Sequence, residues 1–336
     1  MATLKDVAKL ANVNPSTVSR VLHGGNANVS LETRARIMQA AESLQYKANA
    51  AARSLRTRMS GALGLVIPDV ANPTYGQIIE GAEQTARKHG FNVFLLNAHS
   101  HPDLAVYLSM IEEGRVDGLI IANAQLHDAF VAQLDKQKLP YILVNRRTMG
   151  NAPYVVADDL AAAQLEINHL INLGHRKIGY LSGPLQFDTA VTRLQGARQA
   201  FEAAGLDYRQ DMPVVECDYS GEGVAEGVRA LLAERPDLTA VAGANFLITM
   251  TAVKALRSMG KRIPEDISVI GQDETPIAEL CVPGITTVKT QLGLIGSRAA
   301  ELLIGRLKGQ EILSEVLSDP PPHIICREST GPPRTV

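Results

Sequence analysis

From residue 62 onward, short apolar runs alternate with amphipathic stretches, and this pattern most constrains the fold. Alternation of this kind is typical of doubly wound parallel sheets. The apolar runs predict strands over 63–67, 92–97, 117–122, 141–145, 154–157, 177–182, 214–217, 240–243, 268–271, 286–289 and 324–327. Helical spacing predicts helices near 76–88, 104–114, 128–137, 161–173, 193–204, 222–233, 248–259 and 292–307. There are too many predicted strands for one sheet of ordinary size. We therefore expect two α/β lobes with a cleft between them at the carboxyl ends of their strands.

Polar side chains follow many of the predicted strands. Amide, guanidinium, carboxylate and aromatic groups in such positions suit a small polyhydroxylated or anionic ligand. Asn and Asp also end strands as turn formers, so each position has a second explanation. The candidates are Asp69, Asn72, Tyr75, Asn97, Asn123, Asn145, Arg146, Arg147, Thr189, Arg193, Tyr219, Asn245, Gln272 and Asp273.

The stretch 3–22, TLKDVAKLANVNPSTVSRVL, predicts two short helices joined by a tight turn. Thr3 can cap the first helix with Asp6 as its partner, and Asn12 tolerates a left-handed turn. Asn14 can cap the second helix, with Pro15 in its first position. The outward face of the second helix is short, polar and cationic, which suits a groove of DNA. It consists of Ser16, Thr17, Ser19 and Arg20. A helical hairpin with a solvated face is the alternative interpretation.

A third helix and a basic linker follow. Ser30 can cap a helix from 31 to about 44, which completes a compact three-helix head. The segment 49–58, NAAARSLRTR, forms helix well but is too short to stand alone. It could fold when docked on DNA, with Leu55 as an apolar wedge between base steps. The alternative is an Ala-rich linker in which Leu55 packs on the body.

The charge is divided unevenly along the chain. Residues 1–60 carry nine Lys and Arg against three Asp and Glu, although the whole chain has a net charge of −2. The other 276 residues hold 24 basic and 32 acidic groups. A basic head on an acidic body indicates a polyanionic partner for the head.

Several classes of protein are disfavoured. Cys217, Cys281 and Cys326 are widely spaced, which argues against a metal site or a disulfide framework. The N-terminal stretch is polar, and no apolar run reaches the ~18–20 residues of a membrane span. We therefore expect a cytoplasmic, nucleoid-associated protein with no cofactor, metal or membrane partner.

An enzyme on this fold is the main alternative, and a sugar-binding module without DNA function is the second. The run 221–227, GEGVAEG, has Glu226 where a dinucleotide-binding loop requires its third Gly. The sequence contains no P-loop and no GxSxG elbow, so we predict no catalytic residues. The basic head argues against the second alternative.

The ordered motifs resemble one family over nearly the whole chain. They are TLKDVAKLANVNPSTVSRVL, NVSLETRARIMQAAESLQY, NAAARSL, IPDVANPTYGQIIEGAE, RVDGLII, LGHRKIGYLSGP, RLQGARQAF, IPEDISVIGQDE and PGITTVKTQLGLIGSRAAELL. This series resembles the lactose/galactose repressor (LacI/GalR) family. The resemblance implies an effector-controlled transcriptional regulator, expected to act as a repressor, with a helix-turn-helix head, a hinge helix and a two-lobed periplasmic-binding-protein-like body.

The resemblance also implies how the chain is divided. The head is expected at 1–47, the hinge at 48–60 and the effector-binding and dimerisation body at 61–336. One lobe spans about 61–157 and 288–316, and the other about 158–287 and 317–330. The C-terminal sequence lacks the leucine heptads of tetrameric members, so a homodimer on a near-palindromic double-stranded operator is expected.

The resemblance assigns roles to residues of the head and hinge. Pro15, Ser16 and Arg20 match positions that face the major groove. Asn28, Ser30 and Thr33 match phosphate or groove contacts. Asn49, Ala52 and Leu55 match the hinge helix, which enters the minor groove. The full set expected to contact DNA is Thr3, Pro15, Ser16, Thr17, Ser19, Arg20, Asn28, Ser30, Thr33, Tyr46, Asn49, Ala52 and Leu55.

The cleft departs from the family at three places. Phe246 stands where the family usually has Asp, and Gln272 where it usually has Phe or Tyr. Arg147 extends an Asn-Arg-Arg run where the family often has Asp-Arg. Fewer carboxylates and an added guanidinium predict an anionic effector, a sugar acid or a phosphorylated sugar. The alternative is that Arg147 faces solvent or pairs with Asp158 or Asp159. The expected effector-binding residues are Asn72, Tyr75, Arg146, Arg147, Thr189, Arg193, Tyr219, Asn245, Phe246, Gln272 and Asp273.

Overall fold

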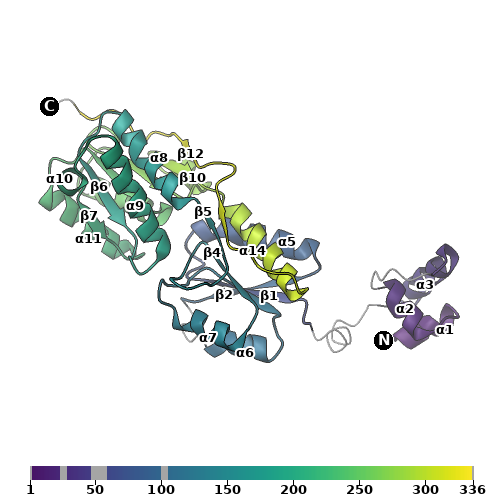
Figure 1. Ribbon diagram of the computed structural model, residues 1–336. Coiled ribbons are helices and arrows are strands. Elements are labelled where there is room, and N and C mark those ends of the chain that lie inside the picture. The colour runs from purple at the N-terminus through teal and green to yellow at the C-terminus, as the bar shows by residue number, and fades with distance from the viewer. Residues whose placement is uncertain (1, 23–28, 47–58, 100–104, 335–336) are drawn as a thin grey trace. The chain divides into compact units, whose positions relative to one another are not determined.

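The structure is a computed structural model that describes residues 2–22, 29–46, 59–99 and 105–334 of the chain. It divides into two compact units, Met1–Ser60 and Gly61–Val336, which are described separately (Figure 1). Asn28, Asn49, Ala52 and Leu55, all predicted to contact DNA, lie outside the described residues.

The first unit is a three-helix head with α1 (Leu4–Leu10), α2 (Pro15–Leu22) and α3 (Leu31–Ser43). The predicted capping box is confirmed, because the Thr3 N–H donates to the Asp6 carboxylate at 2.8 Å while Thr3 accepts from the Asp6 N–H. Asn12 has the expected left-handed backbone, with φ of 51°. The Asn14 side chain accepts from the N–H of Ser16 at 2.9 Å and so caps α2. A small core forms between the helices, from Val7, Ala8, Ala11, Val18, Val21, Ile37, Ala40 and Ala41.

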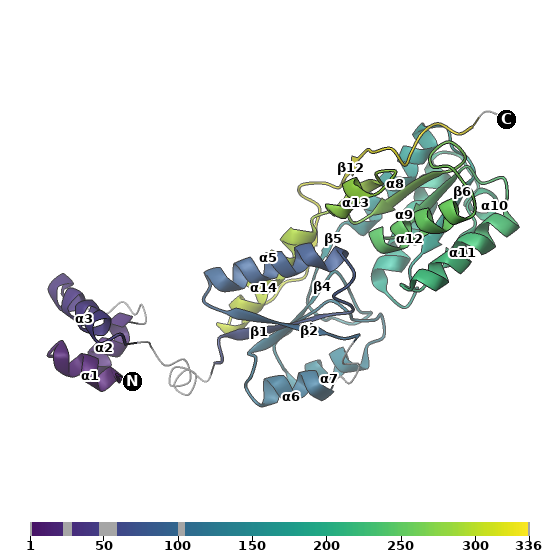
Figure 2. The same cartoon turned by 180° about the vertical axis from the view of Figure 1, so that it is seen from behind.

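The second unit begins with the N-terminal lobe. Its sheet has the strand order β11-β5-β4-β3-β1-β2, and all recorded pairs are parallel. Helices α5 and α14 cover one face and α6 and α7 the other (Figures 1 and 2). The strands are β1 (Ala62–Ile67), β2 (Asn92–Asn97), β3 (Gly118–Ile121), β4 (Tyr141–Val144), β5 (Tyr154–Ala157) and β11 (Glu315–Leu317). The helices are α5 (Thr74–Lys88), α6 (Ala105–Glu112), α7 (Ala129–Gln137) and α14 (Leu292–Leu307).

The C-terminal lobe repeats this plan with the strand order β12-β10-β9-β8-β6-β7. One apolar cluster packs α8 and α9 on the sheet, and another packs α11 and α12. The strands are β6 (Ile178–Ser182), β7 (Val214–Glu216), β8 (Ala240–Gly243), β9 (Ser268–Gln272), β10 (Thr286–Lys289) and β12 (His323–Ile325). The helices are α8 (Asp159–Asn172), α9 (Asp188–Ala203), α10 (Tyr208–Asp211), α11 (Gly221–Glu234), α12 (Phe246–Ser258) and α13 (Ile277–Leu280).

The predicted fold class, with its two doubly wound lobes, is confirmed, and every strand and helix predicted for the body is present. The ends of β2, β5, β8, β10 and α14 are as predicted, and those of the other elements are shifted. The sequence analysis missed β11, α10 and α13, which are too short to establish a period. Edge strand β12 pairs antiparallel with β10, so the second sheet is not wholly parallel. In the described ranges, no helix has the length and apolar character needed to cross a membrane.

Three connections in the described body pass between the lobes, after β5, after β10 and after β11. The expected lobe boundaries at 288 and 317 fall inside strands. Residues 288 and 289 belong to β10, which pairs with β9 of the C-terminal lobe. Residue 317 ends β11, which pairs with β5 of the N-terminal lobe. The sheet ladders therefore shift each boundary by one or two residues.

Candidate functional site

A cavity lies between the two lobes, where the carboxyl ends of their strands face each other. Its empty volume is about 330 Å³, including the part open to solvent. The lining is mostly polar and consists of Asn72, Thr74, Tyr75, Asn145, Arg146, Gly183, Thr189, Ala190, Arg193, Tyr219, Ala244, Asn245 and Asp273.

Arg193 is held between two buried carboxylates. Its Nε donates to Asp159 at 2.7 Å and its Nη2 to Asp273 at 2.8 Å. Its Nη1 donates to the carbonyl of Ala244. Burial raises the pKa of the Asp159 carboxyl, and the Arg193 guanidinium opposes that shift. Because all three charged groups are buried, their geometry is fixed before any ligand arrives.

Arg146 is buried among neutral groups. Its side chain donates to the Thr189 hydroxyl, to the Tyr75 hydroxyl at 3.3 Å and to the Asn145 carbonyl at 3.4 Å. Its guanidinium carbon lies 4.8 Å from the Phe187 ring centroid. Within the described residues, its Nε is buried without a hydrogen-bond partner. Burial raises the pKa of the Tyr75 phenol, which therefore remains a protonated hydroxyl. A desolvated guanidinium held by neutral groups favours an incoming anion.

The rest of the lining combines amides with an aromatic wall. Asn245 uses its Oδ1 to cap α12, which fixes its side chain at the cavity. Asn145 has a left-handed backbone with φ of 57°, and its Oδ1 has no partner among the described residues. The Tyr219 ring lies 6.3 Å from that of Phe187. A Cβ at Gly183 would come within 2.7 Å of the Tyr219 hydroxyl, so glycine lets this ring reach the cavity.

Eight of the predicted effector residues line the cavity: Asn72, Tyr75, Arg146, Thr189, Arg193, Tyr219, Asn245 and Asp273. Three lie outside it, contrary to the prediction. Arg147 pairs with Asp188 at 2.7 Å, a carboxylate that the sequence analysis had not considered. Phe246 begins α12 and points into the apolar core. Gln272 donates to Glu166 at 2.9 Å inside the C-terminal lobe.

Other residues were missed or misplaced. Asp69 and Asn123 follow strands and Asn97 ends β2, but none of the three lines the cavity. Thr74 lines the cavity and donates to Asp273 at 3.4 Å. The sequence analysis selected its neighbours Asn72 and Tyr75 but not Thr74, because no sequence pattern marks it as a site residue. Asp159 supports Arg193 from outside the lining, and its position two residues after β5 was the available signal.

The described DNA-contact candidates lie on the head. Pro15, Ser16 and Arg20 are exposed on α2, and the Arg20 Nε donates back to the Ser16 carbonyl at 3.3 Å. Thr17 and Ser19 are half-buried. Thr3 and Ser30 are exposed at the starts of α1 and α3, while Thr33 and Tyr46 are half-buried. The expected DNA contacts did not include the four other exposed cations of the described head.

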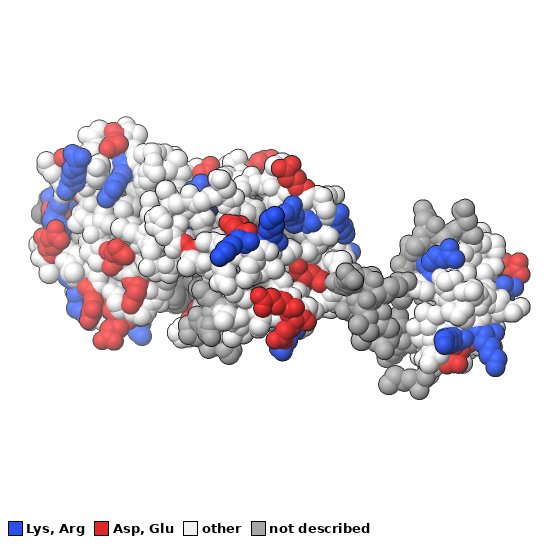
Figure 3. Space-filling view, turned by 60° about the horizontal axis from the view of Figure 1, so that its bottom comes forward, with Lys and Arg blue, Asp and Glu red and all other residues white. Residues whose placement is uncertain are grey.

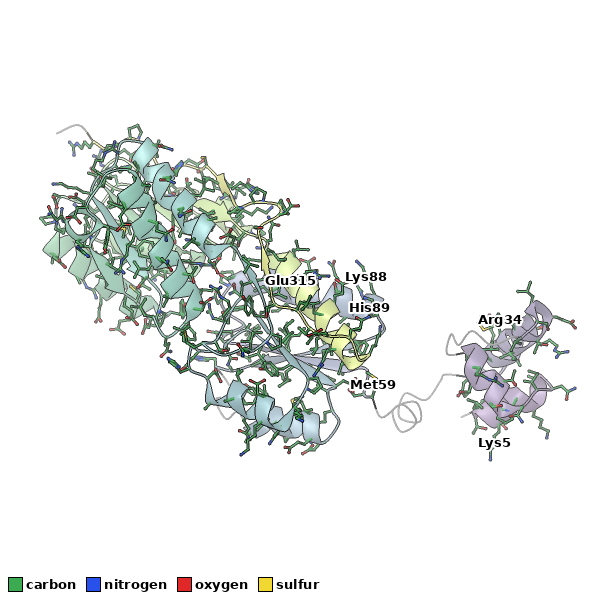
Figure 4. All side chains as sticks on the ribbon, viewed as in Figure 1. Lys5, Arg34, Met59, Lys88, His89 and Glu315 are labelled. Atoms are coloured by element: carbon green, nitrogen blue, oxygen red, sulfur yellow. The ribbon has the colours of Figure 1, made fainter. Side chains whose placement is uncertain are left out.

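Those cations are Lys5 and Lys9 on α1 and Arg34 and Arg36 on α3; Figure 4 labels Lys5 and Arg34 on the head. Figure 3 shows Lys and Arg side chains at separate places on the visible face of the head, beside fewer Asp and Glu side chains. The described head therefore offers short polar groups together with solvated cations, which is the composition of a DNA-facing surface.

The fold and site define a class: helix-turn-helix regulators with a periplasmic-binding-protein-like body. Residues 3–49 match the family model of bacterial regulatory proteins of the lacI family. Residues 60–321 match the model of periplasmic binding proteins and the sugar binding domain of the LacI family. The chain belongs to the LacI family of DNA-binding transcriptional regulators.

The chain is similar to known regulators over nearly its full length. The HTH-type transcriptional regulator CelR of Thermobifida fusca is 34% identical over 341 residues, covering 97% of this chain and 98% of that protein. The solved complex of the transcriptional regulator CelR with cellobiose has a TM-score of 0.74 and 31% identity, covering 98% and 100% of the two chains. The lac repressor dimer bound to operator and the anti-inducer ONPF has a TM-score of 0.80 and 26% identity, covering 98% and 99%.

Proposed function

We propose that this chain is a transcriptional repressor without catalytic activity, which binds a near-palindromic operator as a homodimer. A small anionic carbohydrate, a sugar acid or a sugar phosphate, controls it from the cleft between the lobes. The single observation that carries the effector class is Arg146, a 3% exposed guanidinium whose described contacts are a carbonyl, two hydroxyls and an aromatic ring.

The side chains of the cleft suit both parts of such an effector, its anionic group and its sugar ring. A carboxylate or phosphate matches the planar donor fork of Arg146 and compensates its desolvated charge. Asp273, Arg193 and Asn245 offer acceptors and donors to hydroxyl groups on the rest of the sugar. Tyr219 offers an aromatic face to the apolar side of the ring. The relative in complex with cellobiose supports a carbohydrate in this cleft.

Two observations support the dimer on DNA. The lac repressor relative is a dimer on its operator. On the C-terminal lobe, apolar side chains of and beside α13 are exposed, Leu280 at 79% and Val282 at 74%, and a second copy could cover them. We assign DNA reading to residues 1–47, a hinge to 48–60 and effector binding and dimerisation to 61–336, in a cytoplasmic protein.

Calorimetry of the full chain with matched ligands tests the effector class. Glucose 6-phosphate and galacturonate serve as anionic probes, and glucose and galactose as their neutral counterparts. We expect an anionic probe to bind, and Arg146→Gln to weaken it about 100-fold, equivalent to ~3 kcal/mol.

Arg298→Gln is the matched control, because Arg298 pairs with Glu315 at 3.0 Å away from the cavity lining. Binding should be the same in this variant as in the unchanged protein. Tight binding of a neutral sugar alone, unaffected by Arg146→Gln, would contradict the anionic effector.

A gel shift with the chain's own upstream DNA tests the regulator role. Specific binding should fall steeply as salt rises, because phosphate contacts release counterions. Removal of residues 1–60 should abolish it. If residues 61–336 alone bound that DNA equally well, DNA reading would not reside in the head.

A further inference from the structure

Two successive residues after β4 contact two successive residues at the start of α9. Arg146 donates to Thr189, and both side chains line the cavity. Next to this inner pair, Arg147 and Asp188 form an outer pair that does not line it, with the Arg147 Nε 2.7 Å from Asp188 Oδ2. Because β4 belongs to the N-terminal lobe and α9 to the C-terminal lobe, the outer pair joins the two lobes at the edge of the cleft.

The outer pair is held in place from several sides. The Arg147 Nη2 donates to the Thr192 hydroxyl at 3.2 Å, and its guanidinium carbon lies 5.6 Å from the Tyr154 ring centroid. The side chains are only 30% and 13% exposed. Asp188 lies in the first turn of the 16-residue helix α9, where the helix dipole favours a negative charge. A fixed, partly buried pair of this kind contributes more than a flexible surface pair.

A backbone bond joins the lobes at the same corner. The Leu126 N–H donates to the Gln186 carbonyl at 2.9 Å, and the Met149 N–H donates to the Leu126 carbonyl at 2.8 Å. Leu126 follows β3 in the N-terminal lobe, whereas Gln186 precedes α9 in the C-terminal lobe. None of these three residues lines the cavity, so an effector can replace the inner contacts of Arg146 and leave this corner unchanged.

We propose that Arg147 and Asp188 form a latch that holds the lobes closed over the effector and thereby restricts the effector to a single sugar ring. The size limit rests on the proposed effector function, whereas the latch itself does not. Tyr75, Arg146 and Asp273 are each at most 3% exposed, so the lobes enclose the cavity as they stand. A second sugar ring would have to project between the lobes and break the contacts at their edge.

Hydrogen exchange in the ligand-free full chain tests the latch. The Leu126 amide should exchange about three- to tenfold faster in Arg147→Gln and in Asp188→Asn, because the partners of its bond separate more often. The double variant should be no faster than either single variant, since both remove one interaction. Arg298→Gln breaks a pair of similar exposure within the N-terminal lobe and should leave Leu126 unchanged. Unchanged exchange in both latch variants would overturn the proposal.

Paired ligands test the size limit. Glucose 6-phosphate and trehalose 6-phosphate share one phosphorylated ring and differ by a second ring; galacturonate and digalacturonate form a second pair. The unchanged protein should prefer the one-ring member about tenfold or more. Both latch variants should reduce that preference about three- to tenfold. An unchanged preference in both variants would overturn the size limit. Failure of every probe to bind would instead contradict the proposed effector class, and Leu126 exchange would still decide the latch.

Discussion

The head and the cleft use their polar side chains in opposite ways. In the head, the hydroxyls of Thr3, Ser16 and Ser30 each have a partner two or three residues away, and these contacts are exposed. In the cleft, Arg193 contacts carboxylates 34 and 80 residues away, and these contacts are buried. The head therefore forms its polar contacts within single turns, whereas the cleft requires two sheets to fold around it.

Because of this difference, substitutions in the head and in the cleft should lower stability by different amounts. When an exposed contact within one turn is lost, its groups can hydrogen-bond to water instead, so the free energy of unfolding falls by only about 1 kcal/mol. A buried charge left without its partner cannot recover hydration, so its loss costs several kcal/mol. Substitutions in the cleft should consequently affect both stability and ligand binding. Substitutions on the head surface should affect the head alone.

Removal of the Arg193 guanidinium should have the largest effect on stability. Arg193→Met keeps much of the side-chain volume but leaves Asp159 and Asp273 buried without their shared cation. We expect a loss of about 3–5 kcal/mol in the free energy of unfolding at pH 7, together with loss of effector binding. Urea denaturation and calorimetry measure the two effects.

The matched comparison is Arg298→Met, in which Arg298 and its partner Glu315 are both partly exposed. Solvent should reduce the loss there to about 1 kcal/mol or less. If Arg193→Met cost no more than Arg298→Met, burial would not distinguish the cleft from the surface.

Glu166 should make the stability of the body depend on pH. It is fully buried beside Gln272, and burial raises the pKa of its carboxyl to about 8. Arg193 and Asp273 are the charged groups that influence it. Because the folded state binds this proton more tightly than the unfolded chain, the contribution is fully present below pH ~4.5 and is lost as the pH rises towards 8.

Glu166→Gln keeps a neutral group of the same shape, so it should remove this pH dependence. At pH 8.5, we expect the variant to be about 2–4 kcal/mol more stable than the unchanged protein, with a much smaller difference at pH 5. Thermal unfolding across pH 5–9 measures it. Parallel pH profiles for the two proteins would show that the Glu166 carboxylate is tolerated in the fold.

Sequence patterns located the head better than the cleft for a physical reason. Capping and helical spacing act over three or four residues, so Thr3, Asn12 and Asn14 could be assigned from their neighbours alone. Nine of the fourteen polar residues expected at strand ends line the cavity. Their side-chain directions, however, depend on packing against elements far away in the chain.

Each of the three misplaced residues is the immediate neighbour of a residue that lines the cavity. Arg147 follows Arg146, Phe246 follows Asn245, and Gln272 precedes Asp273. Successive side chains at strand ends and helix starts point in different directions, so a one-residue error moves a side chain out of the cavity. At these three places the position after a strand predicted the correct segment but could not identify which of the two neighbouring residues lines the cavity.

Loss of the cap on α2 should have the smallest effect and should remain within the head. Asn14→Ala removes the side-chain oxygen that accepts from the N–H and hydroxyl of Ser16. We expect the free energy that protects head amides to fall by about 1 kcal/mol, while the body is unchanged. Hydrogen exchange of the full chain follows both units at once. Ser220→Ala is the matched control, because Ser220 caps α11 of the body by accepting from the Gly223 N–H at 3.0 Å. It should destabilise α11 by a similar amount and leave the head unaffected. Faster exchange in the body of Asn14→Ala would mean that the stability of the head is coupled to that of the cleft.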